Sequence, residues 1–241
     1  MIDLHAHILP GFDDGPRTRE EALQMCRRAA EDGIKVILAT PHALNGHSLV
    51  STAQVYQAVT SLNTLLAEGE IDVIILPGAD VHLDSCLIEK VREGQVLTVN
   101  NNRRYILLEF PATTVPASSE QILFQLMLQG VVPIITHPER NYVFQKEISC
   151  LERFVQQGAL VQVTAMSLTG QFGREPQKSV VKMLKKGLVH VIASDAHSVA
   201  HRPPLLSRAV HSASEIVGEE KAKDMVSLVP ELIVKGEKID D

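Results

Sequence analysis

The sequence lacks the features that would place a protein in a membrane, on nucleic acid or outside the cell. No apolar run approaches the roughly 18 residues of a membrane-spanning helix, and the first residues lack the basic and apolar segments of a signal peptide. Lysine and arginine (23) are outnumbered by aspartate and glutamate (29), which excludes a protein built to neutralise nucleic-acid phosphates. Three widely spaced cysteines, Cys26, Cys86 and Cys150, exclude a disulfide framework. We therefore expect a cytoplasmic protein without a membrane span.

What the chain does contain is an alternation of two kinds of segment. Short apolar, β-branched runs predict buried strands, and longer stretches with apolar residues at helical spacing separate them. The predicted strands are residues 1–5, 35–40, 72–78, 104–110, 131–136, 159–164 and 188–194. The predicted helices are residues 18–32, 52–68, 85–93, 118–129, 147–157 and 175–186, and a capping box of Thr18 and Glu21 opens the first.

This alternation predicts a parallel sheet covered by helices, because parallel strands need long crossover connections. The chain has 241 residues and 45% hydrophobic content, and α/β barrels of this size are routinely one domain. No linker or low-complexity tract interrupts it. We expect residues 1–241 to form a single domain that ends in a short polar tail from about residue 230.

A histidine or a carboxylate follows nearly every predicted strand. The sixth strand is the exception and ends in Gln162 and Thr164. The others are followed, in chain order, by His5, His7 and Asp14; by His42; by Asp80; by Glu109; by His137; and by Asp195 and His197. In a closed βα barrel the carboxyl ends of the strands converge on the face where active sites are built. We therefore expect these nine side chains to share one pocket.

Five histidines and four carboxylates in one pocket predict a metal centre. Imidazole with carboxylate suits zinc, manganese or iron, and nine ligands suit two or three ions. His5 and His7 alternate along a strand and so point to the same face. Taken singly, this pair also fits two hydrogen-bonded histidines at a surface strand end, and Asp80 or Glu109 fits a capping or salt-bridging carboxylate. The series as a whole favours the metal centre.

Two arginines and one cysteine are further candidates. Arg140 and Arg202 follow proposed ligands closely, and a guanidinium binds phosphate oxygens bidentately, although each arginine also fits a surface ion pair. Cys86 and Arg92 match the C-x5-R signature of cysteine-dependent tyrosine phosphatases. The segment between them is an amphipathic helical stretch without glycine, which does not form the phosphate-cradling loop of that chemistry. We expect no cysteine mechanism.

Four motifs, D-x-H-x-H (3–7), T-P-H (40–42), H-P-E-R (137–140) and S-D-A-H (194–197), resemble in this order the PHP (polymerase and histidinol phosphatase) superfamily. Within it, HILPGFDDGP and THPERN are similar to the CpsB/CapC-type bacterial tyrosine-protein phosphatases, which are linked to capsule and exopolysaccharide synthesis. The resemblance covers residues 1 to about 205. It implies a distorted TIM-like (β/α)7 barrel of the PHP type, with a trinuclear and commonly manganese-activated site.

The resemblance also implies a role for each ligand. It assigns His5, His7 and Asp195 to a first ion, Glu109 and His137 to a second, Asp80 to the bridge between them, and Asp14, His42 and His197 to a third. Arg140 and Arg202 fall where the family contacts phosphate. The family usually has glutamate where this chain has the shorter Asp80, which leaves two or three ions open. His82 is a candidate to compensate, although we favour a plain loop histidine there.

The activity that the resemblance implies is hydrolysis of phosphotyrosine by attack of a metal-activated hydroxide. The implied substrate is the tail of a bacterial tyrosine kinase that controls capsule or exopolysaccharide synthesis, and the implied metal is Mn²⁺, with Fe, Zn, Co or Mg as alternatives. Two other functions stay open, a small-molecule phosphomonoesterase such as a histidinol phosphatase, and a catalytically weak metal-binding regulator. The proline-rich segment 110–120 fits either a mobile lid or a plain surface loop.

Overall fold

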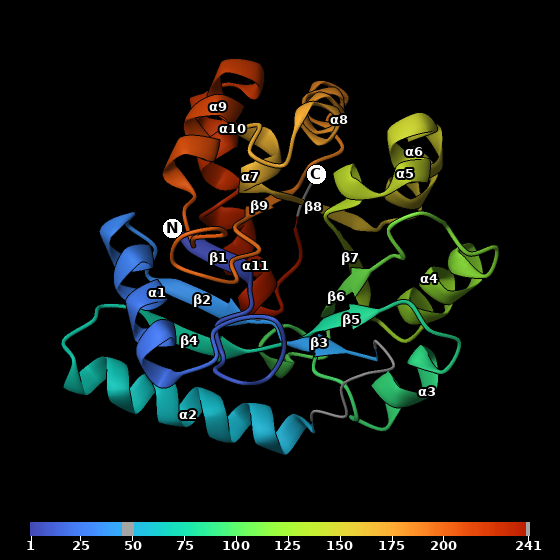
Figure 1. Cartoon of the computed structure of the whole chain (residues 1–241). Helices are drawn as coiled ribbons and strands as arrows, with labels where there is room; N and C mark the ends of the chain where they lie inside the picture. The colour runs from blue at the N-terminus through green and yellow to red at the C-terminus, as the bar shows by residue number, and fades with distance from the viewer. Residues whose placement is uncertain (45–50, 240–241) are drawn as a thin grey trace.

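Strands and helices alternate along the chain, as Figure 1 shows for the computed structural model, which describes residues 1–44 and 51–239. The strands are β1 (Ile2–Ala6), β2 (Val36–Ala39), β3 (His42–Ala43), β4 (Ile74–Pro77), β5 (Asp80–His82), β6 (Tyr105–Glu109), β7 (Val132–Thr136), β8 (Leu160–Thr164) and β9 (Val191–Ala193). The helices are α1 (Arg19–Glu31), α2 (Thr52–Glu68), α3 (Leu87–Arg92), α4 (Ser119–Leu128), α5 (Tyr142–Lys146), α6 (Ile148–Gln156), α7 (Ala165–Leu168), α8 (Arg174–Lys185), α9 (Ser207–Val217), α10 (Glu219–Asp224) and α11 (Leu228–Lys235), with short 3-10 turns η1 (Val99–Asn101) and η2 (Pro138–Arg140). Every predicted strand and helix is present, and the capping box of Thr18 and Glu21 opens α1. None of the described helices is both long and apolar enough to cross a membrane.

All strand pairs are parallel and fall into two sheets, with the orders β1-β2-β4 and β3-β5-β6-β7-β8-β9. Two of the seven predicted strands, 35–40 and 72–78, are each followed by a further short strand beyond the predicted end. Pro41, which has no N–H to donate, separates β2 from β3, and Gly78 and Ala79 separate β4 from β5. Since β3 pairs with β5 in the register His42↔Asp80, the second and third strand positions run on from one sheet into the other.

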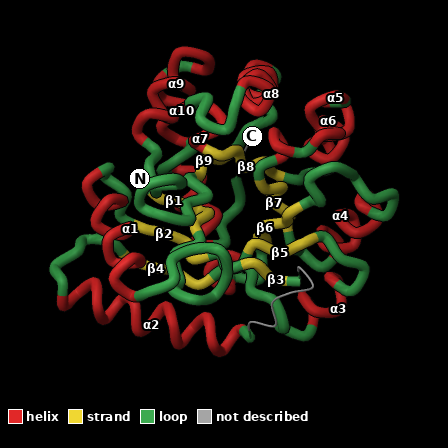
Figure 2. Tube along the Cα trace, viewed as in Figure 1, coloured by secondary structure: helices red, strands yellow, loops and turns green. Residues whose placement is uncertain are grey.

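Backbone hydrogen bonds also join the first strand to the last. The N–H of Asp195 donates to the His5 carbonyl oxygen at 2.8 Å, and the N–H of His7 donates to the Ala196 carbonyl oxygen at 2.8 Å. The strands therefore form a ring, and Figure 2 shows helices around the outside of it. The predicted α/β fold of barrel type is confirmed.

Side chains alternate between the two faces of each strand. Those that face the inside of the ring are apolar along most of the strand and polar at its carboxyl end. On β6, Tyr105 and Leu107 belong to the apolar cluster inside the ring, and Glu109 lies on the same face at the carboxyl end. The other buried members of this interior cluster are Leu4, Leu38, Val99, Ile134, Val191 and Ile233. A larger apolar cluster packs the helices against the outside of the strands. Glu109 thus lies at the carboxyl end of its strand, beyond the interior apolar cluster.

The C-terminal segment differs from the predicted polar tail. Residues 228–235 form α11, and Ile233 is fully buried in the interior cluster. The side-chain amide of Asn102 donates to the Ile233 carbonyl oxygen at 2.6 Å, and the Tyr105 hydroxyl donates to the Glu237 carbonyl oxygen at 2.6 Å. This helix therefore packs at the end of the ring away from Glu109.

Candidate metal centre

The two histidines of the first strand are held by partners on opposite sides. His5 and His7 are both buried, and their Nε2 atoms lie 3.2 Å apart. The Nδ1 atom of His5 lies 2.9 Å from Gln162 Oε1, and the Nδ1 atom of His7 lies 2.6 Å from Asp13 Oδ2. Metal-binding histidines characteristically have the second ring nitrogen held in this way by an oxygen, which aims the first nitrogen at the ion. Both Nε2 atoms are accordingly oriented as a pair of ligands.

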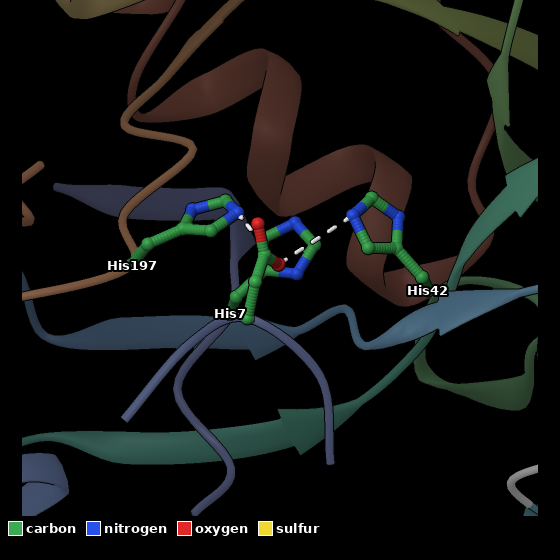
Figure 3. A group of neighbouring side chains, drawn as sticks. His7, His42 and His197 are labelled. Atoms are coloured by element: carbon green, nitrogen blue, oxygen red, sulfur yellow. Dashed lines mark ion pairs between the residues drawn. The ribbon is translucent and has the colours of Figure 1, made fainter. Parts of the chain in front are cut away.

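A second group of side chains lies nearest the opening of the site. In Figure 3 His197 and His42 lie on either side of His7, and dashed lines mark the ion pairs of both outer rings. Those ion pairs are with Asp14, whose Oδ1 atom lies 3.2 Å from His197 Nε2 and 3.7 Å from His42 Nε2. The His7 and His197 ring centroids are only 3.9 Å apart. Asp14 is 63% exposed whereas His7 is buried, so this group extends from the interior to the surface.

A third group lies at the ends of the strands that follow. The Nε2 atom of His137 lies 3.5 Å from Glu109 Oε1 and 4.0 Å from Asp80 Oδ2. Asp80 Oδ2 also lies 3.7 Å from His5 Nε2, so this carboxylate is within reach of two neighbouring groups of potential ligands. Its other oxygen accepts a hydrogen bond from the Thr136 hydroxyl at 3.2 Å. The shorter aspartate therefore lies between the two groups despite its missing methylene.

Three of these potential ligand atoms are in ion pairs but make no hydrogen bond within the part of the chain that the structure describes. His42 Nδ1, Asp80 Oδ2 and Glu109 Oε2 are buried and make no hydrogen bond to any described residue. His42 Nδ1 lies 3.5 Å from Asp80 Oδ2 and 3.4 Å from Glu109 Oε2. Two ligands of one tetrahedral ion stand about 3.4 Å apart when their bonds are about 2.1 Å long. These spacings and the atoms without hydrogen bonds fit divalent cations held between the side chains.

The site also shifts the pKa values of its histidines in opposite directions. Burial lowers the pKa of His42, but the carboxylates of Asp80 and Glu109 outweigh it and raise the pKa to about 11. Burial and the nearby Arg140 lower the pKa of His137 to about 3. His137 is therefore neutral at pH 7, as a ligand must be, whereas His42 holds a proton that a metal ion has to displace.

Two residues of the site have left-handed backbone conformations that residues other than glycine rarely adopt. His137 has a φ of 34° and Asp195 has a φ of 53°. His137 directly follows β7, and Asp195 is the second residue after the end of β9. Such left-handed residues cost free energy and persist at functional sites, where the surrounding structure holds them in place. Here the strain turns a ligand into the pocket at each of the two strand ends.

The two predicted arginines converge on one carboxylate. Oδ2 of Asp195 lies 2.6 Å from Arg202 Nη2 and is also paired with Arg140 Nη2, while its Oδ1 lies 3.5 Å from the Nε2 atoms of both His5 and His7. Asp195 thus joins the arginines to the first pair of ligands. Arg140 also lines a cavity of about 220 Å³ together with Glu109, Thr136, His137 and Asn141, and Phe110 and Ala112 complete it.

The structure brings all nine predicted ligands together and adds residues that the sequence did not single out. Asp13, beside the predicted Asp14, holds His7, and Gln162 of the sixth strand position holds His5. His82 is not a plain loop histidine, because its Nε2 atom lies 2.8 Å from Glu109 Oε2. The neighbouring DD pair was the one visible signal for Asp13, and sequence alone does not say which of the two carboxylates is the ligand.

Two open alternatives are also resolved by the structure. The segment after Glu109 is tied down, because the Asn141 side-chain amide donates to the carbonyl oxygens of Pro111 at 2.7 Å and Thr114 at 3.0 Å. It is a surface loop pinned beside the site. Cys86 is exposed just before α3, and its thiol contacts Asp84, whose carboxylate raises the pKa of the thiol. A raised pKa opposes the thiolate that cysteine-dependent phosphatases need.

A ring of parallel strands that gathers histidines and carboxylates at its carboxyl ends defines a metal-binding enzyme of the barrel class. The chain belongs to the CpsB/CapC family, described as capsular polysaccharide synthesis, CpsB/CapC, which matches residues 1–235. The resemblance to the CpsB/CapC family, predicted from HILPGFDDGP and THPERN, is thereby confirmed.

Relatives and solved structures agree with this assignment. The chain is 36% identical over 220 residues to tyrosine-protein phosphatase YwqE of Bacillus subtilis (strain 168), covering 91% of this chain and 86% of that protein. It is 36% identical over 211 residues to the putative tyrosine-protein phosphatase CapC of Staphylococcus aureus, covering 86% and 81%. A crystal structure from work on YwqE of Bacillus subtilis and CpsB of Streptococcus pneumoniae, described as unique metal-dependent tyrosine phosphatases, superposes with a TM-score of 0.96 at 35% identity, covering 100% of this chain and 96% of that one.

Proposed function

We propose that this chain is a metal-dependent protein-tyrosine phosphatase. The observation that carries the proposal is the junction at Asp195, where a buried set of metal ligands meets two arginines. Ligands for divalent ions and guanidinium groups are together what phosphoryl transfer requires, because the reaction depends on positioning and on neutralising charge. The names of YwqE, CapC and CpsB as tyrosine-protein phosphatases support the same activity.

The ligand set fits two or three divalent ions, with Mn²⁺ as the first candidate. His5, His7 and Asp195 would hold the first ion, Glu109 and His137 the second, with Asp80 between them, and Asp14, His42 and His197 the third. When bound, such ions neutralise the oxygens of the reacting phosphate and lower the pKa of water to near neutrality.

The chain's own residues orient the phosphate group. Arg140 and Arg202 are about one quarter exposed, so their guanidinium groups reach solvent while Asp195 anchors them from the buried side. Guanidinium binds phosphate oxygens bidentately and stays charged at every working pH. The leaving group is a phenol with a pKa near 10, so the bond to phosphorus breaks with less help from a proton donor than an alkyl ester needs.

The open side of the site favours a protein substrate. The group nearest the surface contains Asp14, which is 63% exposed, whereas His5 and His7 at the back are buried. A phosphotyrosine on a flexible chain end reaches such a site readily, and the tail of a bacterial tyrosine kinase of capsule or exopolysaccharide synthesis has this character. Three free cysteines suit the cytoplasm, where such a tail is found.

Phosphate release from a phosphotyrosine peptide and from histidinol phosphate, measured side by side, tests the proposal. The protein is first stripped by a chelator and then given Mn²⁺. We expect manganese-dependent turnover of the peptide that is lost in His7→Ala and retained in Cys86→Ser. A preference for histidinol phosphate would instead assign a small-molecule phosphatase, and turnover of neither substrate would indicate a metal-binding regulator.

A further inference from the structure

One aromatic side chain lies against both arginines of the site. The guanidinium carbon of Arg140 lies 5.3 Å from the centroid of the Phe172 ring, and that of Arg202 lies 5.5 Å from the same centroid. Both distances are within the reach of a cation–π interaction. Phe172 and its neighbours in the sequence form no recognisable motif, and Phe172 is not one of the predicted metal ligands.

The loop that carries Phe172 is specified locally. It connects α7 to α8, and it contains Gly170 and Gly173, whose φ values of 84° and 95° suit glycine. The N–H of Gln171 donates to the Met166 carbonyl oxygen at 2.9 Å, and the N–H of Gly173 donates to the Gly170 carbonyl oxygen at 3.0 Å. Through α7 this loop follows β8, the sixth strand position, which contributes no metal ligand of its own.

The charges explain what the ring does there. Arg140 and Arg202 carry the same charge and share a single carboxylate oxygen, that of Asp195. Asp14 is a second negative charge near Arg202, but the two guanidinium groups still repel each other, and the negative face of an aromatic ring offsets part of that repulsion. The Nε atoms of both arginines are buried and make no hydrogen bond to any described residue, so each keeps a donor for a ligand oxygen.

We propose that Phe172 is a positioning residue that holds both guanidinium groups in place for a phosphate group. The inference rests on the proposed function, because it takes the arginines to bind the phosphate of the substrate. The Phe172 ring lies against the two arginines, which are not among the predicted metal ligands. Its loss is therefore expected to weaken anion binding and to leave the metal ions in place.

The test compares Phe172→Leu, which removes the aromatic face, with Phe172→Tyr, which keeps it. The matched control is Phe124→Leu on α4, where the ring is 55% exposed and is not one of the predicted site residues. In the manganese-loaded protein we expect the KM for a phosphotyrosine peptide and the Kd for inorganic phosphate, measured by calorimetry, to rise about tenfold in Phe172→Leu. Both constants stay near those of the wild type in Phe172→Tyr and Phe124→Leu, and the manganese content per chain is the same in all four proteins.

Two results would overturn the inference. One is wild-type phosphate affinity in Phe172→Leu, and the other is a loss of manganese that accompanies the loss of phosphate affinity, as a general structural defect would produce. A wild-type protein that binds phosphate but does not hydrolyse phosphotyrosine would refute the proposed function. In that case a selective loss of phosphate binding in Phe172→Leu still supports the role of the ring.

Discussion

Replacing Gly15 by alanine should disable the metal centre without altering a ligand. Gly15 lies in the loop between β1 and α1, where its N–H donates to Asp13 Oδ1 at 3.0 Å. A Cβ atom added there would lie 2.5 Å from the His7 carbonyl oxygen and 3.0 Å from Asp13 Oδ1. Ordinary van der Waals contact begins at about 3.5 Å, so the loop has to move by roughly 1 Å to accept the methyl group.

Such a displacement separates Asp13 from the groups that it holds. Asp13 Oδ2 lies 2.6 Å from His7 Nδ1 and accepts a hydrogen bond from the His42 N–H at 3.2 Å. Losing an oxygen that orients a metal-binding histidine typically weakens metal affinity by about 10–100-fold. The forced packing itself costs about 1–3 kcal/mol of stability. Gly15→Ala should therefore bind manganese far more weakly while remaining folded.

Calorimetric titration of the stripped protein with Mn²⁺ measures this effect, and thermal melting monitors the fold. Gly11→Ala in the same loop is the control, because Gly11 has a φ of 77° and no atom within 4 Å of an added Cβ. That variant incurs backbone strain of about 1–2 kcal/mol and should keep its manganese. Wild-type manganese affinity in Gly15→Ala would refute the reasoning.

Three further predictions concern other parts of the molecule. Burial raises the pKa of Asp3 from 3.8 to about 6. Between these two pH values the free energy of unfolding of the wild type should therefore fall by roughly 3 kcal/mol relative to that of Asp3→Asn as the pH rises. Denaturant titrations of both proteins measure this difference, and curves that stay parallel across the pH range would contradict it. With a pKa of about 11, His42 should release its proton when Mn²⁺ binds at neutral pH. Because the buffer takes up this proton, the measured binding enthalpy should change with the ionisation enthalpy of the buffer in the wild type and change less in His42→Ala. Asn141→Ala removes both hydrogen bonds to the loop after Glu109, so limited proteolysis should cut residues 111–118 sooner, and an unchanged cleavage pattern would contradict this.

The convergence of the site's histidines and carboxylates was predictable because a parallel barrel has a strong geometric rule. Each buried strand is recognisable from its own residues, and the carboxyl ends of such strands meet on one face. Residues as far apart in the chain as His5 and Asp195 could therefore be placed together, and the structure has their side chains 3.5 Å apart. The break at the end of two predicted strands, at Pro41 and after Pro77, did not disturb this outcome because a further short strand follows each break in the neighbouring sheet.

The residues that orient the ligands were not predictable in the same way. Asp13, Gln162 and Phe172 act through contacts with a ligand or an arginine from another part of the chain, and such contacts leave no periodicity or spacing in the sequence. His82 is a similar case, because its role depends on the pairing of β5 with β6 that brings it to Glu109.

The sequence of the C-terminal helix contains a helical pattern of apolar residues, but the polar residues that follow it favoured the prediction of a tail. Leu228 and Leu232, and Val229 and Ile233, are each four residues apart, which is the spacing of one helix face. Polar residues dominate the segment from residue 235 onward and suggested a tail instead. Only the open end of the ring, which the strands leave for Ile233 to fill, decides between the two.

The seam between the first and last strands also determines the order in which this protein becomes functional during its synthesis. Asp3 accepts a hydrogen bond from the Ser194 N–H across 191 residues of chain, and the predicted ligands His5 and Asp195 lie two residues and one residue further along the chain. A growing chain presents His5 and His7 first but completes the seam only when its last strand has left the ribosome. A product that ends before residue 194 therefore lacks the closed ring and also lacks Asp195, the carboxylate that lies beside His5 and His7.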